Sequence, residues 1–235
     1  MTKLLFLFGV GRSGTSALVN VLNSHPKILL GQERYFFQIR REDIVPEHFE
    51  KERFLDVRAE DTHKMGGLKG KDLSARYDEA VYVGDKFPSL FRHLDLMFER
   101  FPDAHYLYIL RNPLSVVESY DARFRNPKDH WKHTWEDGIE AWNESVGKVS
   151  RLPEERLKSF TLVQYESLFS SAANINDMFA DLGLPPVPEE KLARFVKKFN
   201  ELNESAVPRN DHLRMNVGRR ADWQAYRTLL ERIER

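Results

Sequence analysis

The sequence contains no cysteine among its 235 residues, which excludes disulfide bridges, thiolate zinc sites and cysteine nucleophiles. It also carries no net charge, since 36 Lys and Arg residues balance 36 Asp and Glu residues. The overall charge therefore predicts neither nucleic acid nor an anionic membrane surface as a partner. Any anion-binding site has to be built locally, from a few residues.

Long apolar runs are scarce as well. The apolar stretch 4–10 near the N-terminus is too short to cross a bilayer and is not followed by a signal-peptide cleavage pattern. We therefore expect no membrane span and a soluble intracellular protein. Hydrophobic residues make up 41% of the chain, which is enough to build a core. The length predicts a single domain over residues 1–235.

A glycine-rich segment, Gly9-Val-Gly-Arg-Ser-Gly-Thr-Ser16, follows this apolar stretch. The pattern is typical of a buried strand, a tight loop and a helix start. Glycines let the backbone approach an anion closely, and the first N–H groups of a helix have no partner within the helix. The segment also contributes one cation and three hydroxyl donors, which are Arg12, Ser13, Thr15 and Ser16. It therefore predicts a site for phosphate or sulfate.

This segment lacks the lysine of a nucleotide-triphosphate P-loop. When Gly9 and Gly14 are aligned with G-x-x-x-x-G-K-[ST], Thr15 stands where the lysine belongs. No ammonium group is then available to reach the β- and γ-phosphates, which argues against an ATP or GTP hydrolase. A glycine-rich strand–helix turn that binds nothing is the alternative that this segment alone leaves open.

Strands and helices are predicted to alternate along the chain. After the first strand, further strands are predicted at 28–30, 80–84, 105–110 and 160–164. Helices are predicted at 16–24, 90–101, 114–120, 134–149, 171–182, 188–202 and 223–233. This alternation predicts a three-layer α/β/α fold with a central parallel sheet. For residues 38–80, which are dense in charge, we expect short helices and a mobile loop for substrate recognition or closure.

The motif Gly11-Arg12-Ser13-Gly14-Thr15-Ser16, followed by Leu22-Asn23-Ser24-His25-Pro26, resembles the 5′-phosphosulfate loop of sulfotransferases. These enzymes take a sulfuryl group from 3′-phosphoadenosine 5′-phosphosulfate (PAPS) and release 3′-phosphoadenosine 5′-phosphate (PAP). Arginine in place of lysine at position 12 looks like the protein-tyrosine and bacterial branches. The resemblance implies a P-loop NTPase-like sulfotransferase fold, and a reaction that uses PAPS without a metal.

Three further segments resemble the nucleotide-binding elements of this family. An arginine at a strand end with a serine eight positions later, Arg111 and Ser119, is similar to its 3′-phosphate motif. Tyr165 resembles its adenine-contacting tyrosine, although a strand-end tyrosine is often plain packing. Gly218-Arg219-Arg220 looks like its C-terminal 3′-phosphate loop, with solvated surface charge as the alternative.

The same resemblance implies the catalytic residues. Glu33 follows Arg12 by twenty-one residues, the offset of the catalytic glutamate in the protein-tyrosine branch, and is assigned as general base. Lys86, in Gly84-Asp-Lys-Phe-Pro88, resembles the Lys-x-Pro element that steadies the transferring group, as Arg12 does from the loop. The alternatives are a surface pair between Glu33 and a neighbouring arginine, and an ordinary strand-end lysine.

We therefore expect a PAPS-dependent sulfotransferase that acts on an acceptor hydroxyl, with an amine as the less favoured acceptor. A bacterial-style cytoplasmic enzyme is the better match within the family, because the chain shows no membrane anchor. The acceptor can be a saccharide, lipid, peptide or small metabolite, recognised through the segments 38–80 and 121–134; nothing in the sequence indicates the oligomeric state. The alternatives are a P-loop kinase-like phosphotransferase and a nucleotide-binding module without catalysis.

Overall fold

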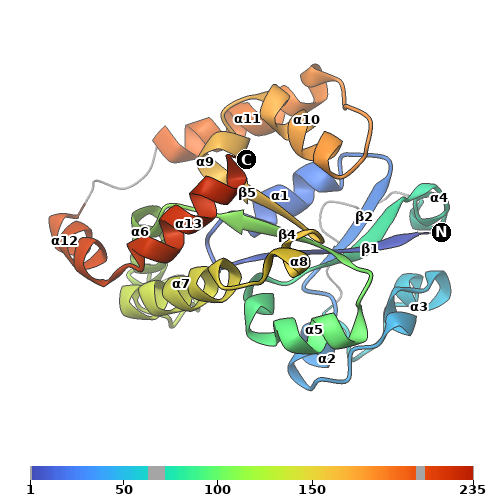
Figure 1. The fold of residues 1–235 in the computed structure, drawn as a ribbon, viewed down its shortest axis with the longest axis horizontal. Coiled ribbons are helices and arrows are strands. Elements are labelled where there is room, and N and C mark those ends of the chain that lie inside the picture. Colours follow the sequence, from blue (N-terminus) through green and yellow to red (C-terminus); the bar gives the residue numbers. More distant parts are fainter. Residues whose placement is uncertain (1, 63–71, 205–209, 235) are drawn as a thin grey trace. The chain divides into compact units, whose positions relative to one another are not determined.

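The computed structural model describes residues 2–62, 72–204 and 210–234. Its centre is a five-stranded sheet in the order β2-β3-β1-β4-β5 (Figure 1). The strands are β1 Lys3–Gly9, β2 Ile28–Gln32, β3 Tyr82–Lys86, β4 His105–Leu110 and β5 Phe160–Gln164. Helices flank the sheet, so the three-layer α/β/α fold with a parallel sheet is confirmed.

Strand β3 begins and ends two residues later than the sequence pattern predicts. Pairing with the two neighbouring strands sets these limits. At the start of β3, the N–H groups of Val81 and Tyr82 both donate to the carbonyl of Lys27, the residue directly before β2. Pairing then continues until Lys86 lies opposite Leu7 of β1 and opposite Gln32 of β2. Lys86 is therefore the last residue of a central strand and not part of the loop that follows.

Backbone contact inside the sheet explains one glycine of this strand. Gly84 lies opposite Leu5 of β1, and a Cβ atom at this position would lie 1.9 Å from the Leu5 carbonyl oxygen. Any side chain there would push the two strands apart. Around this point the sheet is apolar, and Leu5, Leu29 and Val83 are fully buried. Burial of such residues is the main driving force for the fold.

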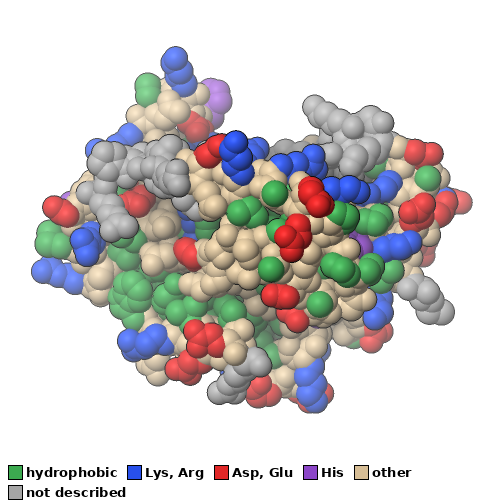
Figure 2. All heavy atoms as spheres, turned by 90° about the horizontal axis from the view of Figure 1, so that it is seen from above, with side chains coloured by type: hydrophobic (Ala, Val, Ile, Leu, Met, Phe, Trp, Pro, Cys, Tyr) green, Lys and Arg blue, Asp and Glu red, His purple; other side chains and the backbone are tan. Residues whose placement is uncertain are grey.

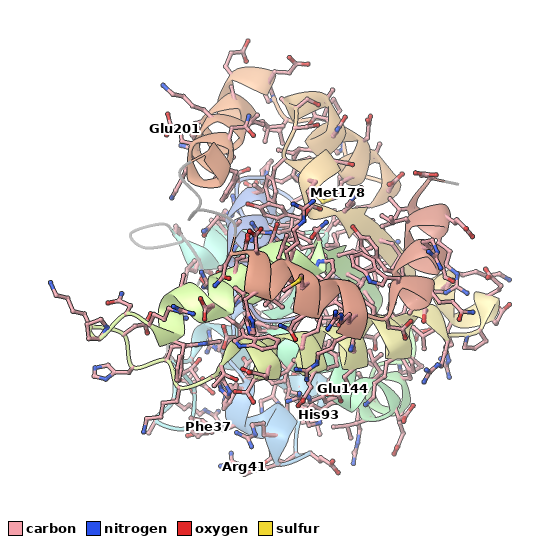
Figure 3. The ribbon with its side chains drawn as sticks, turned by 90° about the vertical axis from the view of Figure 1, so that its left-hand side faces the viewer. Phe37, Arg41, His93, Glu144, Met178 and Glu201 are labelled. Atoms are coloured by element: carbon pink, nitrogen blue, oxygen red, sulfur yellow. The ribbon has the colours of Figure 1, made fainter. Side chains whose placement is uncertain are left out.

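The chain forms two compact units, each made of several stretches. The first unit contains residues Met1–Gly9, Thr15–Tyr108 and Arg156–Thr161. It holds β1 to β3 and the helices α1 Thr15–Leu22, α2 Phe36–Arg40, η1 Pro46–Phe49, α3 Lys51–Leu55, α4 Leu73–Glu79, η2 Pro88–His93 and α5 Leu94–Arg100. Phe37 of α2 and Arg41, which follows this helix, lie at the surface (Figure 3).

The second unit contains residues Val10–Gly14, Ile109–Glu155 and Leu162–Arg235. Its helices are α6 Pro113–Phe124, α7 Trp135–Ser150, α9 Tyr165–Leu168, α10 Ala172–Asp181, α11 Glu189–Glu204, α12 Asp211–Arg220 and α13 Trp223–Ile233. Helix α7 packs against α6 and α13. Strands β4 and β5 and the short helix α8 Glu154–Leu157 contribute residues to both units. The single domain expected from the sequence stays a prediction.

The charged segment 38–80 contains short helices, as predicted, and part of it (63–71) lies outside the described residues. Among the described residues, no helix is both long and apolar enough to cross a membrane. Acidic and basic side chains are interspersed on the face drawn in Figure 2. This mixture agrees with the balanced charge of the sequence.

Candidate active site

The glycine-rich loop Val10–Gly14 belongs to the second unit and turns sharply. The backbone of Arg12 is left-handed, with φ of 70°, and the N–H of Ser13 donates to the Val10 carbonyl over 3.1 Å. Gly14 has φ of 100°, and a Cβ atom there would lie 2.4 Å from the ring of Tyr165. Glycine is thus required at position 14 both for the turn and for the close approach of this ring.

The two motifs for which the sequence predicts anion binding contact each other in the structure. Arg12, from the loop, donates from Nε to the Oγ of Ser119 on α6 over 2.9 Å. Arg111, at the end of β4, donates from Nη1 to the carbonyl oxygen of Arg12 over 3.0 Å. Residues about a hundred positions apart in the chain are therefore in direct contact, as a shared binding site requires.

Tyr165 also joins this cluster. The guanidinium of Arg111 lies 4.1 Å from the centre of the Tyr165 ring, within the range of a cation–π interaction. The backbone of Arg111 is held as well, because its carbonyl accepts a hydrogen bond of 2.9 Å from Nε1 of Trp142 on α7. Tyr165 is thus a buried residue that packs against the Arg111 guanidinium, and its contact with adenine stays a prediction.

The electrostatics of the loop favour an anion. Burial lowers the pKa of the Arg12 guanidinium below its ordinary value, and the positive charges of Arg123 and Arg111 lower this pKa further. A bound anion would relieve the repulsion among these cations. In addition, the Oγ of Ser13 is buried and has no hydrogen-bond partner among the described residues. A buried hydroxyl without a partner is costly, and an anionic oxygen would satisfy it.

The C-terminal motif corrects one expectation. Gly218, Arg219 and Arg220 form the last turn of α12, whereas the sequence predicted a loop. The side chain of Asn210 caps the start of this helix, because it accepts from the N–H of His212 over 3.0 Å. The residues that follow are compatible with a helix, so α12 continues to Arg220. Arg220 lies 3.4 Å from a carboxylate oxygen of Glu140 on α7, a half-exposed ion pair.

The first unit holds the two remaining catalytic assignments, which contact each other. The Nζ of Lys86 donates to Oε1 of Glu33 over 2.6 Å, and it lies 3.4 Å from the Oγ of Ser16 in the first turn of α1. Gln32 donates to the same Ser16 hydroxyl over 3.2 Å. The Lys86 side chain is fully buried, while the Glu33 side chain is 28% exposed. Glu33 is therefore paired with the buried lysine rather than with a surface arginine.

Two residues that are assigned to catalysis have a strained backbone conformation. Among the described residues, positive φ angles at non-glycine positions occur at Arg12, Glu33 (φ 58°) and Glu42 (φ 62°). Two of these three are assigned catalytic residues. Side chains rarely adopt this conformation, and where it persists the surrounding structure has to enforce it.

Asp85, next to the assigned Lys86, has a role that the sequence interpretation missed. Its carboxylate is almost fully buried and accepts hydrogen bonds from the N–H groups of Tyr35 (3.0 Å) and Lys86 (2.9 Å). Burial raises the pKa of Asp85 to about 6, against the opposing effect of these hydrogen bonds. Its position directly after an apolar strand pattern was the available signal, since a charged residue that is buried there needs partners.

The described residues contain no group of three or more His, Asp or Glu side chains that could hold a metal ion. They do contain the glycine-rich loop of the second unit and the Glu33–Lys86 pair of the first unit. These two clusters contain most of the residues that the sequence singled out: Gly11, Arg12, Ser13, Gly14, Arg111, Ser119 and Tyr165 in the second unit, and Thr15, Ser16, Glu33 and Lys86 in the first.

Solved structures of similar fold are sulfotransferases. The sulfotransferase from Alicyclobacillus acidocaldarius is 17% identical and superposes with a TM-score of 0.62, covering 100% of this chain and 97% of that chain. The sulfotransferase domain from the curacin biosynthetic pathway is 16% identical, with a TM-score of 0.54 over 80% of this chain and 76% of that chain. The corresponding domain of the Synechococcus PCC 7002 olefin synthase is 20% identical, with a TM-score of 0.52 and coverages of 82% and 78%.

Sequence comparison adds the family. No curated protein matches the chain. The model of the sulfotransferase family matches residues 5–189, which is more than half of the chain and includes both the glycine-rich loop and the Arg111–Ser119 motif. The structural likenesses establish the fold, and this match establishes the membership. The chain belongs to the sulfotransferase family and is a transferase.

Proposed function

We propose that this protein transfers a sulfuryl group from PAPS to a hydroxyl of its acceptor, with an amine as the less favoured acceptor. The observation that carries the proposal is the contact of Arg12 with Ser119 and of Arg111 with Arg12. It unites the loop motif and the 3′-phosphate motif of the sequence in one cationic cluster. A donor with anionic groups at both ends of a nucleoside matches such a cluster.

The hydrogen bonds that are already present leave these residues able to bind phosphate. Ser119 accepts from Arg12, so its own O–H can donate to a phosphate oxygen. Arg111 would offer a guanidinium fork to the 3′-phosphate, while the Tyr165 ring supports its plane. Arg12 uses Nε for Ser119, and its other N–H groups are available to the 5′-phosphosulfate.

The loop and the end of α12 complete the proposed donor site. The hydroxyls of Ser13, Thr15 and Ser16 and the backbone at Gly11 and Gly14 would hold the 5′-phosphosulfate. The buried Ser13 hydroxyl supports this assignment. We propose Gly218, Arg219 and Arg220 as further contacts of the 3′-phosphate. They lie at the C-terminal end of α12, where both arginines are exposed to solvent.

The proposed chemistry is an in-line displacement at sulfur. The acceptor oxygen forms a bond to sulfur while the bond between sulfur and the 5′-phosphate oxygen breaks, and PAP leaves with that electron pair. Glu33 takes the hydroxyl proton. Because Lys86 binds Oε1 of this carboxylate, Oε2 is left to accept it. Lys86 and Arg12 provide positive charge for the oxygen of the leaving group.

Two other functions are distinguishable by experiment. Incubation with sulfur-labelled PAPS and a panel of saccharide, lipid, peptide and small-molecule alcohols tests transfer directly. We expect labelled product with excess EDTA present, because the proposed reaction needs no metal. Phosphoryl transfer from ATP that requires magnesium would favour a kinase-like phosphotransferase. PAP binding without transfer to any acceptor would favour a nucleotide-binding module. We further propose a cytoplasmic, bacterial setting, which fractionation of the source cells tests.

A further inference from the structure

The conformation of Glu33 has to be enforced by its neighbours. With φ of 58° its backbone is in the left-handed region, which is unfavourable for a non-glycine residue. Its N–H donates to the carbonyl of Lys86 over 2.7 Å. Its carbonyl oxygen accepts from the hydroxyl of Thr62, twenty-nine residues further along the chain. The N–H and the carbonyl group of Glu33 are therefore both held by hydrogen bonds.

Asp85 fixes the residues that follow Glu33. Its buried carboxylate accepts from the N–H of Tyr35, and hydrogen bonding from the backbone of Arg34 also stabilises its charge. Gly31 makes room for this arrangement, because a Cβ atom there would lie only 2.8 Å from Oδ1 of Asp85. The turn after β2 thus wraps around one buried carboxylate that comes from β3.

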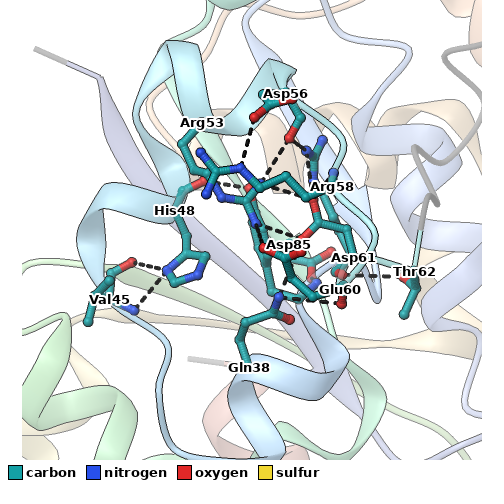
Figure 4. Close-up of polar contacts among 12 residues, drawn as sticks. Gln38, Val45, His48, Arg53, Asp56, Arg58, Glu60, Asp61, Thr62 and Asp85 are labelled. Carbon is teal, nitrogen blue, oxygen red and sulfur yellow. Dashed lines mark hydrogen bonds and ion pairs between the residues drawn. The ribbon is translucent and has the colours of Figure 1, made fainter.

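Thr62 is itself held by a buried ionic cluster (Figure 4). Asp61, whose side chain is fully buried, accepts from Arg34 over 3.2 Å and from both Nη atoms of Arg53 over 2.7 and 2.9 Å. The N–H of Thr62 donates to the carbonyl of Arg34 over 3.1 Å. The residue directly after Glu33 therefore anchors the segment that carries the threonine hydroxyl back to Glu33.

We propose that Thr62 and Asp85 are positioning residues, which hold Glu33 in its left-handed conformation so that its carboxylate meets Lys86 and accepts a proton. The inference rests on the proposed role of Glu33 as general base. It adds that this role depends on two residues to which the sequence analysis assigned no role. Loss of the threonine hydroxyl releases the Glu33 peptide and misplaces the carboxylate, whereas residues that bind the donor keep their contacts.

The variant Thr62→Val removes the hydroxyl and keeps the side-chain shape, and Thr62→Ser keeps the hydroxyl. Thr161→Val is a matched control in the same unit, because the Thr161 hydroxyl lies 2.9 Å from Nε2 of His105 and does not contact Glu33. For each variant we would measure kcat, the acceptor KM, PAP affinity by calorimetry, and the hydrogen-exchange rates of the Glu33 and Tyr35 amides. The exchange rates require no catalytic activity.

We expect Thr62→Val to lower kcat about 10- to 100-fold, the effect of misplacing a catalytic group by roughly an ångström. The acceptor KM and PAP affinity should stay within about twofold, and exchange at Glu33 and Tyr35 should accelerate. Thr62→Ser should restore both kcat and exchange protection. Thr161→Val should change neither, even where it lowers the melting temperature.

The outcomes separate this inference from the proposed function. If the wild type transfers sulfuryl groups and Thr62→Val keeps its kcat, Thr62 does not position the base. A loss of kcat that Thr62→Ser fails to restore, or that Thr161→Val reproduces, would show a general loss of structure and overturn the inference equally. If the wild type transfers to no acceptor, the proposed function fails and the catalytic role of Thr62 fails with it. Exchange at Glu33 then still reports whether the hydroxyl holds the turn.

Discussion

Lys86 donates from a fully buried side chain to the carboxylate of Glu33 over 2.6 Å. Lys86 is the last residue of β3, and Glu33 follows directly after the neighbouring strand β2. The register explains the contact, because Lys86 lies opposite Gln32, the residue before Glu33. A buried ammonium needs a counter-charge, and the Glu33 carboxylate at this turn supplies one. The pair is thus a product of strand pairing and of the left-handed turn at Glu33.

Glu33→Gln should remove the base without removing donor binding. We expect kcat to fall by about 10²- to 10⁴-fold, the usual contribution of a positioned general base, with PAP affinity unchanged. Glu42→Gln is the matched control, because Glu42 is a second glutamate with positive φ and is exposed. Steady-state kinetics with saturating PAPS checks this, and wild-type turnover in Glu33→Gln would remove Glu33 from the mechanism.

Arg111→Lys should weaken donor binding although it keeps the charge. Lysine lacks the planar fork for phosphate and cannot stack on Tyr165 in the same way. Charge-assisted hydrogen bonds are worth about 1.5–3 kcal/mol, so PAP affinity should fall roughly 10- to 100-fold. Arg100→Lys, at the exposed end of α5, should have no effect in the same calorimetric titration. Equal affinities of wild type and Arg111→Lys would contradict the assignment.

Gly218→Ala should separate stability from binding. A Cβ atom on Gly218 meets nothing within 4 Å, so alanine should stabilise α12 by about 1 kcal/mol. A bound phosphate close to this backbone would be displaced by the added methyl group, and PAP affinity should therefore fall. Gly147→Ala in α7, where a Cβ atom has only ordinary contacts beginning at 3.8 Å, should leave affinity unchanged. Full PAP affinity in Gly218→Ala would remove the α12 end from the donor site.

Asp61→Asn should destabilise the first unit at neutral pH. Removal of the Asp61 charge from a buried ion cluster breaks its ion pair with Arg34 and costs about 3 kcal/mol. Asp43→Asn breaks the exposed pair with Arg41 and should cost about 1 kcal/mol or less. Urea denaturation of both variants beside the wild type at pH 7 measures this difference, and equal costs would contradict it.

The cost of Asp61→Asn should also depend on pH in a defined direction. Burial raises the pKa of Asp61, but the hydrogen bonds from Arg53 and from the N–H of Arg58 outweigh it and hold the pKa below its ordinary value. The folded state therefore binds this proton more weakly than the unfolded state does. The stability that Asp61 contributes is complete above the unfolded pKa of about 3.9 and is lost as the pH falls through the lower folded value. The difference between wild type and Asp61→Asn should shrink in that range.

Local sequence patterns predicted much of the fold. Strands 105–110 and 160–164 and helix 223–233 have the predicted limits, because each is a strong periodic run bounded by residues that end it. The limits of β3 depend on pairing with β1 and β2, which no local pattern records. The family resemblance predicts a loop at the end of α12 because it rests on a glycine and two arginines alone, whereas the continuity of the helix depends on the preceding turns.

For the site, the motifs predicted which residues matter but not what holds them. Arg12, Arg111 and Ser119 come from separate segments of the sequence, and they contact one another only in the folded chain. Thr62 and Asp61 lie in a charged segment without periodicity, so only the folded chain reveals their contacts with Glu33 and Arg34. The left-handed backbone of Glu33 could not be predicted either, because the usual signal for this conformation is a glycine and the sequence has none at this position.

The most direct test of the central claim is a pair of calorimetric titrations, with PAP and with adenosine 5′-phosphate, which lacks the 3′-phosphate. We predict that wild-type protein binds PAP at least about tenfold more tightly, since Arg111 and Ser119 each add a hydrogen bond to the second phosphate. Arg111→Ala should abolish most of this preference. Equal affinity of the wild type for the two nucleotides, or a preference that survives Arg111→Ala, would contradict the account.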